Sequence, residues 1–220
     1  MTTIHHHPGD EWLVALAAGR LESGPALVID AHVEGCAHCR ERVRHYETLG
    51  GALLETLEPA LLAPEALART LAAIDNVPAP GIAPVRPPTP KPPLPPGIAW
   101  PRSLRDCSVM RWRWLGPGMR WSRVTLPHDP AANVFLLRIG AGKCLPRHTH
   151  SDVELTQVLC GSFDDGRATF AQGDFDAADG TIRHQPVVHS GAECICLASV
   201  RGKVLFDGAI ARLFGSMVGM

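Results

Sequence analysis

The sequence lacks an excess of either charge, and it lacks long apolar runs. Its 21 Lys and Arg residues nearly balance 22 Asp and Glu residues, and the net charge of −1 gives no electrostatic reason to expect nucleic acid or an anionic membrane as a direct partner. No apolar stretch reaches the roughly 18 residues that a membrane-spanning helix needs, and the first residues do not have the pattern of a signal peptide. We therefore expect a cytoplasmic protein.

Disulfides are not expected either. The chain holds seven cysteines, an odd number at modest density, and it has no export signal. Such cysteines fit reduced thiols and metal ligands better than a disulfide framework. With 45% hydrophobic residues among 220, the chain has enough apolar side chains for packed cores, which excludes a disordered protein.

A proline-rich segment divides the chain. Ten of the 20 prolines fall within residues 78–96, so this stretch favours extended polyproline conformations. We predict a helical domain over residues 1–77, a semi-rigid linker over 78–97 and a second domain over 98–220. The first part is acidic, because residues 1–75 hold five Arg and no Lys against eleven acids, a net charge of −6.

The first part has apolar residues at helical spacing and is predicted to form a small helical bundle. Pro64 stands at a plausible first-turn position of the last helix in this part. Because that helix is too short to be stable alone, we expect its apolar face to dock partly on a binding partner. The three apolar sets are Leu13, Leu16, Ala17 and Leu21; Leu49, Leu53, Leu54 and Leu57; and Leu67, Leu71 and Ile74.

The second part consists of short β-rich runs separated by turn residues. This pattern predicts an antiparallel sandwich or barrel. The expected fold class is therefore α+β with two domains, a small helical bundle and an all-β barrel joined by the linker. The expected strands span residues 133–139, 154–159, 167–170 and 193–198, with a turn at 164–166.

His32, Cys36 and Cys39 form the first candidate metal site. Their spacing, His-x3-Cys-x2-Cys, can place one nitrogen and two sulfurs on a single ion at the start of a helix, and a closed zinc site requires a fourth ligand. A redox-active Cys-x-x-Cys pair is the alternative, but such pairs belong in βαβ surroundings and these surroundings are helical. The candidates for the fourth ligand are His5, His6 and His7.

This motif, which follows a leading histidine and a helix-forming segment over residues 13–21, resembles the zinc-binding anti-sigma domain. The resemblance implies helices arranged around a zinc ion. It also implies that these helices grip an extracytoplasmic-function sigma factor and block its access to RNA polymerase.

The second candidate site matches every fixed position of the first cupin motif, Gly142-x5-His148-x-His150-x3-Glu154-x6-Gly161. Two histidines at i and i+2 on a strand point to one face, so both can converge with the glutamate inside a small barrel. A second motif begins at Gly173 and ends at His184, which completes three nitrogens and one carboxylate. This donor set suits zinc, iron, manganese, copper or nickel.

The second motif departs from the cupin pattern at three positions. Asp179 and Thr181 stand where the pattern has proline and glycine, and Val188 stands where it usually has asparagine. The departures leave the donor set intact but weaken any transfer of enzymatic detail. A cupin barrel whose histidines bind no metal is the alternative interpretation.

A zinc anti-sigma motif followed by a cupin resembles the ChrR family of anti-sigma factors over nearly the whole chain. The resemblance implies a non-enzymatic regulator that binds an extracytoplasmic-function sigma factor as a one-to-one heterodimer and releases it under singlet oxygen or a related oxidative stress. It implies two zinc sites, one in each domain. The implied ligands are His7, His32, Cys36 and Cys39 in the first site, with His6 as an alternative to His7, and His148, His150, Glu154 and His184 in the second.

Two further questions stay open at this point. A cupin metalloenzyme, such as a dioxygenase, could carry the helical domain as an accessory. Cys194 and Cys196 share one face of an expected strand and are either thiols poised for oxidation or, as is commoner, buried packing residues. We expect an oxidative signal to act through the cupin ligands or nearby thiols and to reach the first domain through the linker.

Overall fold

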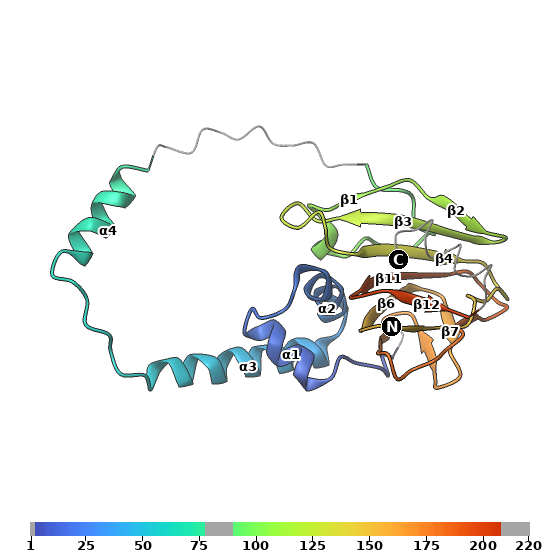
Figure 1. Ribbon diagram of the computed structural model, residues 1–220, viewed down its shortest axis with the longest axis horizontal. Helices are drawn as coiled ribbons and strands as arrows, with labels where there is room; N and C mark the ends of the chain where they lie inside the picture. Colours follow the sequence, from blue (N-terminus) through green and yellow to red (C-terminus); the bar gives the residue numbers. More distant parts are fainter. Residues whose placement is uncertain (1–2, 78–89, 208–220) are drawn as a thin grey trace.

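The structure, a computed structural model, describes residues 3–77 and 90–207 (Figure 1). Helices occupy the first range and antiparallel strands dominate the second, which confirms the predicted α+β class. Residues 78–89 of the expected linker lie outside the described residues, and the domain boundaries stay a prediction. Within the described ranges, no helix has the length and apolar composition that crossing a membrane requires.

Three of the four described helices contribute to a buried core that they share with strand residues such as Leu155; their own members include Leu13, Val28 and Cys39. The chain turns between the second and third helices at Cys36, where the backbone is extended. The sulfur of Cys36 accepts a hydrogen bond from the Cys39 amide at 3.4 Å, and this N-cap fixes both cysteines at the start of a helix. The helices are α1 (Asp10–Ala17), α2 (Ser23–Gly35), α3 (Ala37–Glu55) and α4 (Ala66–Asp75).

The second half of α3 and all of α4 remain outside that core. Leu53 and Leu54 are 68% and 69% exposed, and none of the residues of α4 is buried against the described part of the chain. Helical periodicity therefore identified these helices correctly. Only the first apolar set packs in the common core; the second set is exposed on the second half of α3 and just beyond it, and α4, which carries the third, lies apart from the other helices (Figure 1). The expected docking of α4 on a partner stays a prediction.

The strands form three antiparallel sheets. The largest has the order β1-β3-β4-β11-β6-β9, with β2 paired to β3; the others have the orders β10-β7-β8 and β12-β5. A short 3-10 helix, η1 (Arg102–Leu104), precedes them. The strands are β1 (Ser108–Val109), β2 (Arg113–Gly116), β3 (Met119–Thr125), β4 (Val134–Ile139), β5 (His148–His150), β6 (Glu154–Cys160), β7 (Ser162–Asp164), β8 (Thr169–Ala171), β9 (Phe175–Ala178), β10 (Val187–Val188), β11 (Cys194–Val200) and β12 (Val204–Phe206).

Both faces of the largest sheet are covered. Helix α2 packs across β6 and β11 on one face (Figure 1), and the smaller sheets and their loops cover the other. Every residue of β11 is consequently buried. Gly24 lets α2 approach this closely, because a Cβ added there would lie 2.5 Å from Oγ of Ser199 and 3.2 Å from Cγ2 of Val134. The largest sheet thus separates a helical side from an inner side.

Candidate metal centres

The helical cluster consists of His7, His32, Cys36 and Cys39, whose donor atoms all lie within 4.8 Å of one another. His7 comes from the segment before α1, His32 from the last turn of α2 and the cysteines from the start of α3. The Nδ1 atom of His7 lies 3.4 Å from Nε2 of His32 and 3.4 Å from each sulfur. Nε2 of His32 lies 3.3 Å from the Cys39 sulfur.

These separations fit one tetrahedral ion. Zinc–nitrogen and zinc–sulfur bonds place tetrahedral ligands about 3.3–3.8 Å apart. Four of the six donor pairs of the helical cluster are 3.3–3.4 Å apart, and the other two lie within 4.8 Å. Two imidazole nitrogens and two sulfurs are also the donor set of closed structural zinc sites. The helical cluster could therefore hold a metal ion.

The two pKa shifts in the helical cluster act in opposite directions on metal binding. Burial lowers the pKa of His32 to about 4, so its imidazole is neutral and keeps a lone pair. Burial, together with the neighbouring Cys36, raises the pKa of Cys39 to about 12. Without a cation the Cys39 thiol stays protonated, whereas a bound metal stabilises the thiolate, so metal binding would release a proton.

The three leading histidines have different environments. His7 is the one that reaches the helical cluster, and the ring of His6 lies 4.6 Å from that of Phe170 instead. His5 is exposed. His38, between the two cysteines, is exposed as well, although its ring is 5.0 Å from that of His7.

The cupin cluster consists of His148, His150, Glu154 and His184, and it is buried inside the β-structure. Nε2 of His184 lies 3.1 Å from Nε2 of His148 and 3.2 Å from Nε2 of His150. A carboxylate oxygen of Glu154 lies 3.1 Å from Nε2 of His150. The alternation of β5 aims both of its histidines inward, as the i, i+2 spacing predicts.

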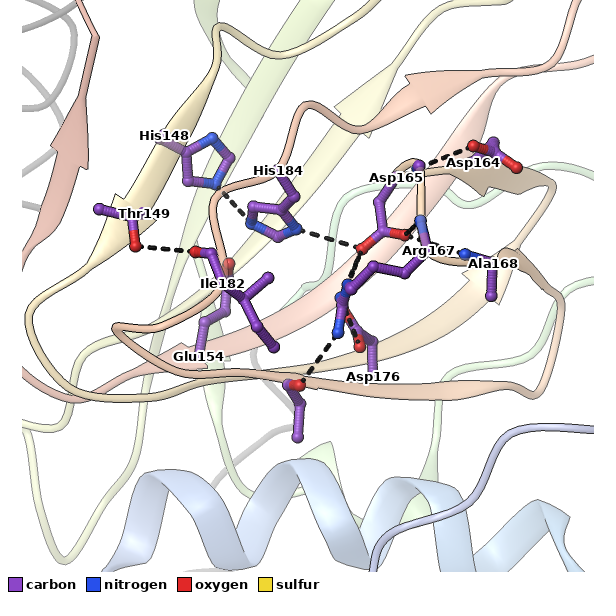
Figure 2. Close-up of polar contacts among 12 residues, drawn as sticks. His148, Thr149, Glu154, Asp164, Asp165, Arg167, Ala168, Asp176, Ile182 and His184 are labelled. Atoms are coloured by element: carbon purple, nitrogen blue, oxygen red, sulfur yellow. Dashed lines mark hydrogen bonds and ion pairs between the residues drawn. The ribbon is translucent and has the colours of Figure 1, made fainter.

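Hydrogen bonds orient two of the three imidazoles, and Figure 2 shows the contact of His184 with Asp165. Nδ1 of His148 donates to the Pro146 carbonyl at 2.8 Å, and Nδ1 of His184 lies 3.3 Å from a carboxylate oxygen of Asp165. Both contacts leave Nε2 unprotonated and directed at the cluster. Nδ1 of His150 is buried and has no hydrogen-bond partner among the described residues.

A carboxylate–guanidinium network supports His184 from behind. The Arg167 guanidinium hydrogen-bonds Asp165 and pairs with Asp176 at 2.7 Å, and Figure 2 shows the chain of contacts from His148 through His184 to Asp176. Burial alone would raise the pKa of Asp165, but hydrogen bonds from His184 and Arg167 hold it well below its usual range. Because Arg167 lies between the two aspartates, this group orients His184 and is not a cation site of its own.

The charge of Glu154 is set in the same way. Burial raises its pKa, but the hydrogen bond from His150 and the surrounding histidines outweigh burial and lower it. The carboxylate is therefore ionised, and a metal ion that replaced the shared proton of His150 would meet three nitrogens and one oxygen. These donors could hold a metal ion.

A cavity of about 30 Å³ adjoins the cupin cluster. Glu154, Phe163, Cys194 and Cys196 are among its lining residues. The sulfurs of Cys194 and Cys196 lie 3.6 Å apart and both residues are buried. A cavity of this size has room for roughly one or two water molecules.

Sequence reasoning missed several residues around both clusters. Asp165 was assigned to a turn and Arg167 to a strand, although β8 begins only at Thr169. Gln157, whose Oε1 lies 2.9 Å from Nδ1 of His32, had no signal at all, because the contact joins residues far apart in sequence. The Asp-x-Arg spacing beside the expected turn was the one available hint of the network.

Comparison with known proteins gives a consistent family assignment. A model of the ChrR cupin-like domain matches residues 101–203. The anti-sigma-E factor ChrR of Cereibacter sphaeroides is 37% identical over 212 residues, which cover 96% of each chain. The crystal structure of Rhodobacter sphaeroides SigE in complex with the anti-sigma ChrR matches with a TM-score of 0.68 and 33% identity, covering 90% of this chain and 100% of that chain.

The 37% identity over 96% of both chains is enough to assign the protein to a family. The described fold accounts for both motifs, since the helical cluster and the cupin cluster each assemble from the residues that the motifs contain. The chain belongs to the ChrR family of anti-sigma factors.

Proposed function

We propose that this protein is an anti-sigma factor that sequesters an extracytoplasmic-function sigma factor in a one-to-one complex. The helical part makes the contact, and the cupin part responds to oxidative stress of the singlet-oxygen type by releasing the sigma factor. The protein acts in the cytoplasm, where RNA polymerase is found. The relative in the crystal structure described above is itself seen with SigE.

The observation that carries this proposal is the exposed apolar segment, residues 49–77. Ten large apolar side chains of this segment are exposed, including Leu53 at 68%, Leu67 at 71% and Ile74 at 62%. Apolar surface of this extent on one segment marks a protein-interaction surface. Helix α4 has ten residues, which is too short for an isolated helix to be stable in water, so a partner that covers its apolar face also stabilises it.

Charge favours the same partner. The helical part has a net charge of −6 over residues 1–75, and a sigma factor must present basic surface to DNA. Complementary charge speeds the encounter and disfavours wrong partners. In this proposal the apolar segment supplies most of the binding free energy. The acidic surface increases the rate of association and its selectivity.

The two clusters receive different tasks in this proposal. A zinc ion in the helical cluster would hold α1, α2 and α3 together, because three of the donor residues come from the α2–α3 junction and the fourth from the segment before α1. The cupin cluster lies beside a cavity and two close thiols, and a zinc ion held there would be within reach of a small oxidant that enters the cavity.

The competing function, a cupin dioxygenase, is less well supported by the cavity. Sites for organic substrates usually measure about 300–1,000 Å³, whereas the cavity beside the cupin cluster measures about 30 Å³. Water or a small oxygen species fits that space. A diketone or a larger organic substrate does not.

Co-expression with an extracytoplasmic-function sigma factor from the same genome tests the proposal. The Leu53→Glu/Leu71→Glu double variant is expected to lose co-purification, because two charges would enter the apolar contact. Leu205→Glu is the matched control, since Leu205 is 47% exposed on β12 of the cupin part. Co-purification that survives the double variant but fails with Leu205→Glu would contradict the assignment of the surface.

A further inference from the structure

The helical cluster is not enclosed by helices alone. The ring of His32 packs edge-on against Phe175 at a centroid distance of 5.8 Å, and its Nδ1 lies 2.9 Å from Oε1 of Gln157. Gln157 belongs to β6 and Phe175 to β9, and the two residues are direct partners in the antiparallel pairing of these strands. Two cupin strands therefore form one wall of the helical cluster.

The amide of Gln157 has a fixed orientation. Its Nε2 donates to the Val158 carbonyl at 3.2 Å, which leaves Oε1 facing His32. An amide oxygen only accepts hydrogen bonds, so Nδ1 of His32 carries the proton and donates it. The lone pair of His32 is then on Nε2, the atom that points at His7 and Cys39.

The segment that carries His7 is also fastened to the cupin strands. Oδ1 of Asp174 accepts hydrogen bonds from the backbone amides of His5 at 2.6 Å and His6 at 3.0 Å. The amide of Phe175 donates to the His6 carbonyl at 3.0 Å. Beside these contacts, Gly173 leaves room for Ile4, because a Cβ at Gly173 would lie 2.9 Å from that side chain.

Strand β6 connects the two clusters through its alternating faces. Glu154 points to the inner side and joins the cupin cluster, whereas Gln157 points to the helical side. Strand β9 repeats this arrangement, with Asp176 in the network behind His184 and Phe175 against His32. A displacement of β6 or β9 at the cupin cluster would consequently move the contacts of His32.

We infer that Gln157 is a positioning residue for the helical cluster. Through Gln157, the cupin fold influences the metal affinity of this cluster, although none of the four donor residues belongs to the cupin fold. The inference rests on the proposed function only in taking the helical cluster as a metal site. It assigns Gln157 two effects. Gln157 selects the imidazole tautomer of His32, and it aligns the ring with the other three donors.

Cobalt titration of the full-length protein tests the inference. Thiolate-to-cobalt absorption reports the helical cluster alone, since the cupin cluster contains no sulfur donor. With a competing chelator, we expect Gln157→Met to weaken cobalt binding at this cluster by about 10–100-fold, the usual effect of losing such a partner. Gln157→Glu, which keeps an acceptor for Nδ1, should bind cobalt far more tightly than Gln157→Met. Gln185→Met, at an exposed glutamine, should match the wild type.

Two results would overturn the inference: wild-type affinity in Gln157→Met, or equal weakening in Gln157→Met and Gln157→Glu. If Gln157→Met does not fold, ¹⁵N NMR of the metal-loaded wild type can determine which nitrogen of His32 binds the metal. Metal on Nδ1 of His32 would exclude the positioning role of Gln157, because Gln157 would then have no Nδ1 proton to accept. Sigma-factor binding is measured on the same wild-type preparation. A protein that binds cobalt as expected but no sigma factor contradicts the proposed function and leaves the role of Gln157 intact.

Discussion

The helical cluster and the cupin cluster each contain four donors, but they differ in chemistry and surroundings. The helical cluster has two sulfurs and two nitrogens within 4.8 Å of one another, so its four donors could complete the coordination of one metal ion. The cupin cluster has three nitrogens and a carboxylate, an orienting network and an adjoining cavity. The first arrangement suits an ion that holds a fold together, and the second suits an ion that a small molecule can reach.

The largest effect that we expect to distinguish the two clusters comes from replacing a cysteine of the helical cluster. Cys39→Ser removes a fully buried ligand of the helical cluster. Since structural zinc in small domains supplies folding free energy on the order of 10 kcal/mol, α1, α2 and α3 should lose their packing and sigma-factor binding should be abolished. Far-UV circular dichroism, zinc content and co-purification measure the three effects.

The neighbouring His38 supplies the control for that variant. His38 is exposed between the two cysteines, so His38→Ala should retain zinc, helix content and the sigma factor. If Cys39→Ser keeps its zinc and its partner, the helical cluster does not have the structural task assigned to it.

An intermediate effect is expected from the network behind His184. Arg167→Met leaves Asp165 and Asp176 without their shared cation and releases His184 from its orientation. Metal affinity of the cupin cluster should fall by about 10–100-fold, and the thiolate–cobalt signal of the helical cluster should not change. Competition titration of each site measures both quantities.

Arg183→Met is the matched control, because Arg183 also pairs with a carboxylate, that of Asp207, but at the surface. Its effect on either metal site should be negligible, as is usual for exposed ion pairs. Equal effects of the two arginine variants would argue against an orienting role for the network.

The smallest expected effect concerns the contact between the two sides of the large sheet. Gly24→Ala forces a Cβ against Ser199 and should lower the free energy of unfolding by about 1–3 kcal/mol. Gly35→Ala, at the other end of α2 with nothing within 4 Å, should be neutral or slightly stabilising. Denaturant unfolding compares them, and adding Ser199→Ala should recover part of the loss. No difference between the glycine variants would mean that α2 can shift on the sheet at no cost.

The sequence predicted the helices, most of the strands and the two sets of four side chains that come together in the helical cluster and the cupin cluster. Those predictions depend on local spacing: alternation in β5, a Cys-x-x-Cys pair at the start of α3 and motif offsets for His184. Gln157, Asp174 and Arg167 could not be predicted in this way. Their roles arise from pairing between distant segments, which spacing along one segment does not determine.

Periodicity also could not tell a buried face from a face that awaits a partner. Leu13 and Leu71 both follow helical spacing, yet Leu13 is fully buried and Leu71 is 52% exposed. Both helices bury apolar surface in the proposed complex, but only one does so within its own chain. Apolar periodicity predicts that a helix face is buried, but it does not show whether the same chain or a partner covers that face.

The most direct test of the division between the clusters is the sigma-factor affinity of His150→Ala before and after exposure to singlet oxygen. His150 is a buried member of the cupin cluster and has no contact with the helical cluster in the described structure. We predict that the variant binds the sigma factor as tightly as the wild type and no longer releases it on oxidation. Loss of binding before oxidation, or release equal to that of the wild type, would contradict the account.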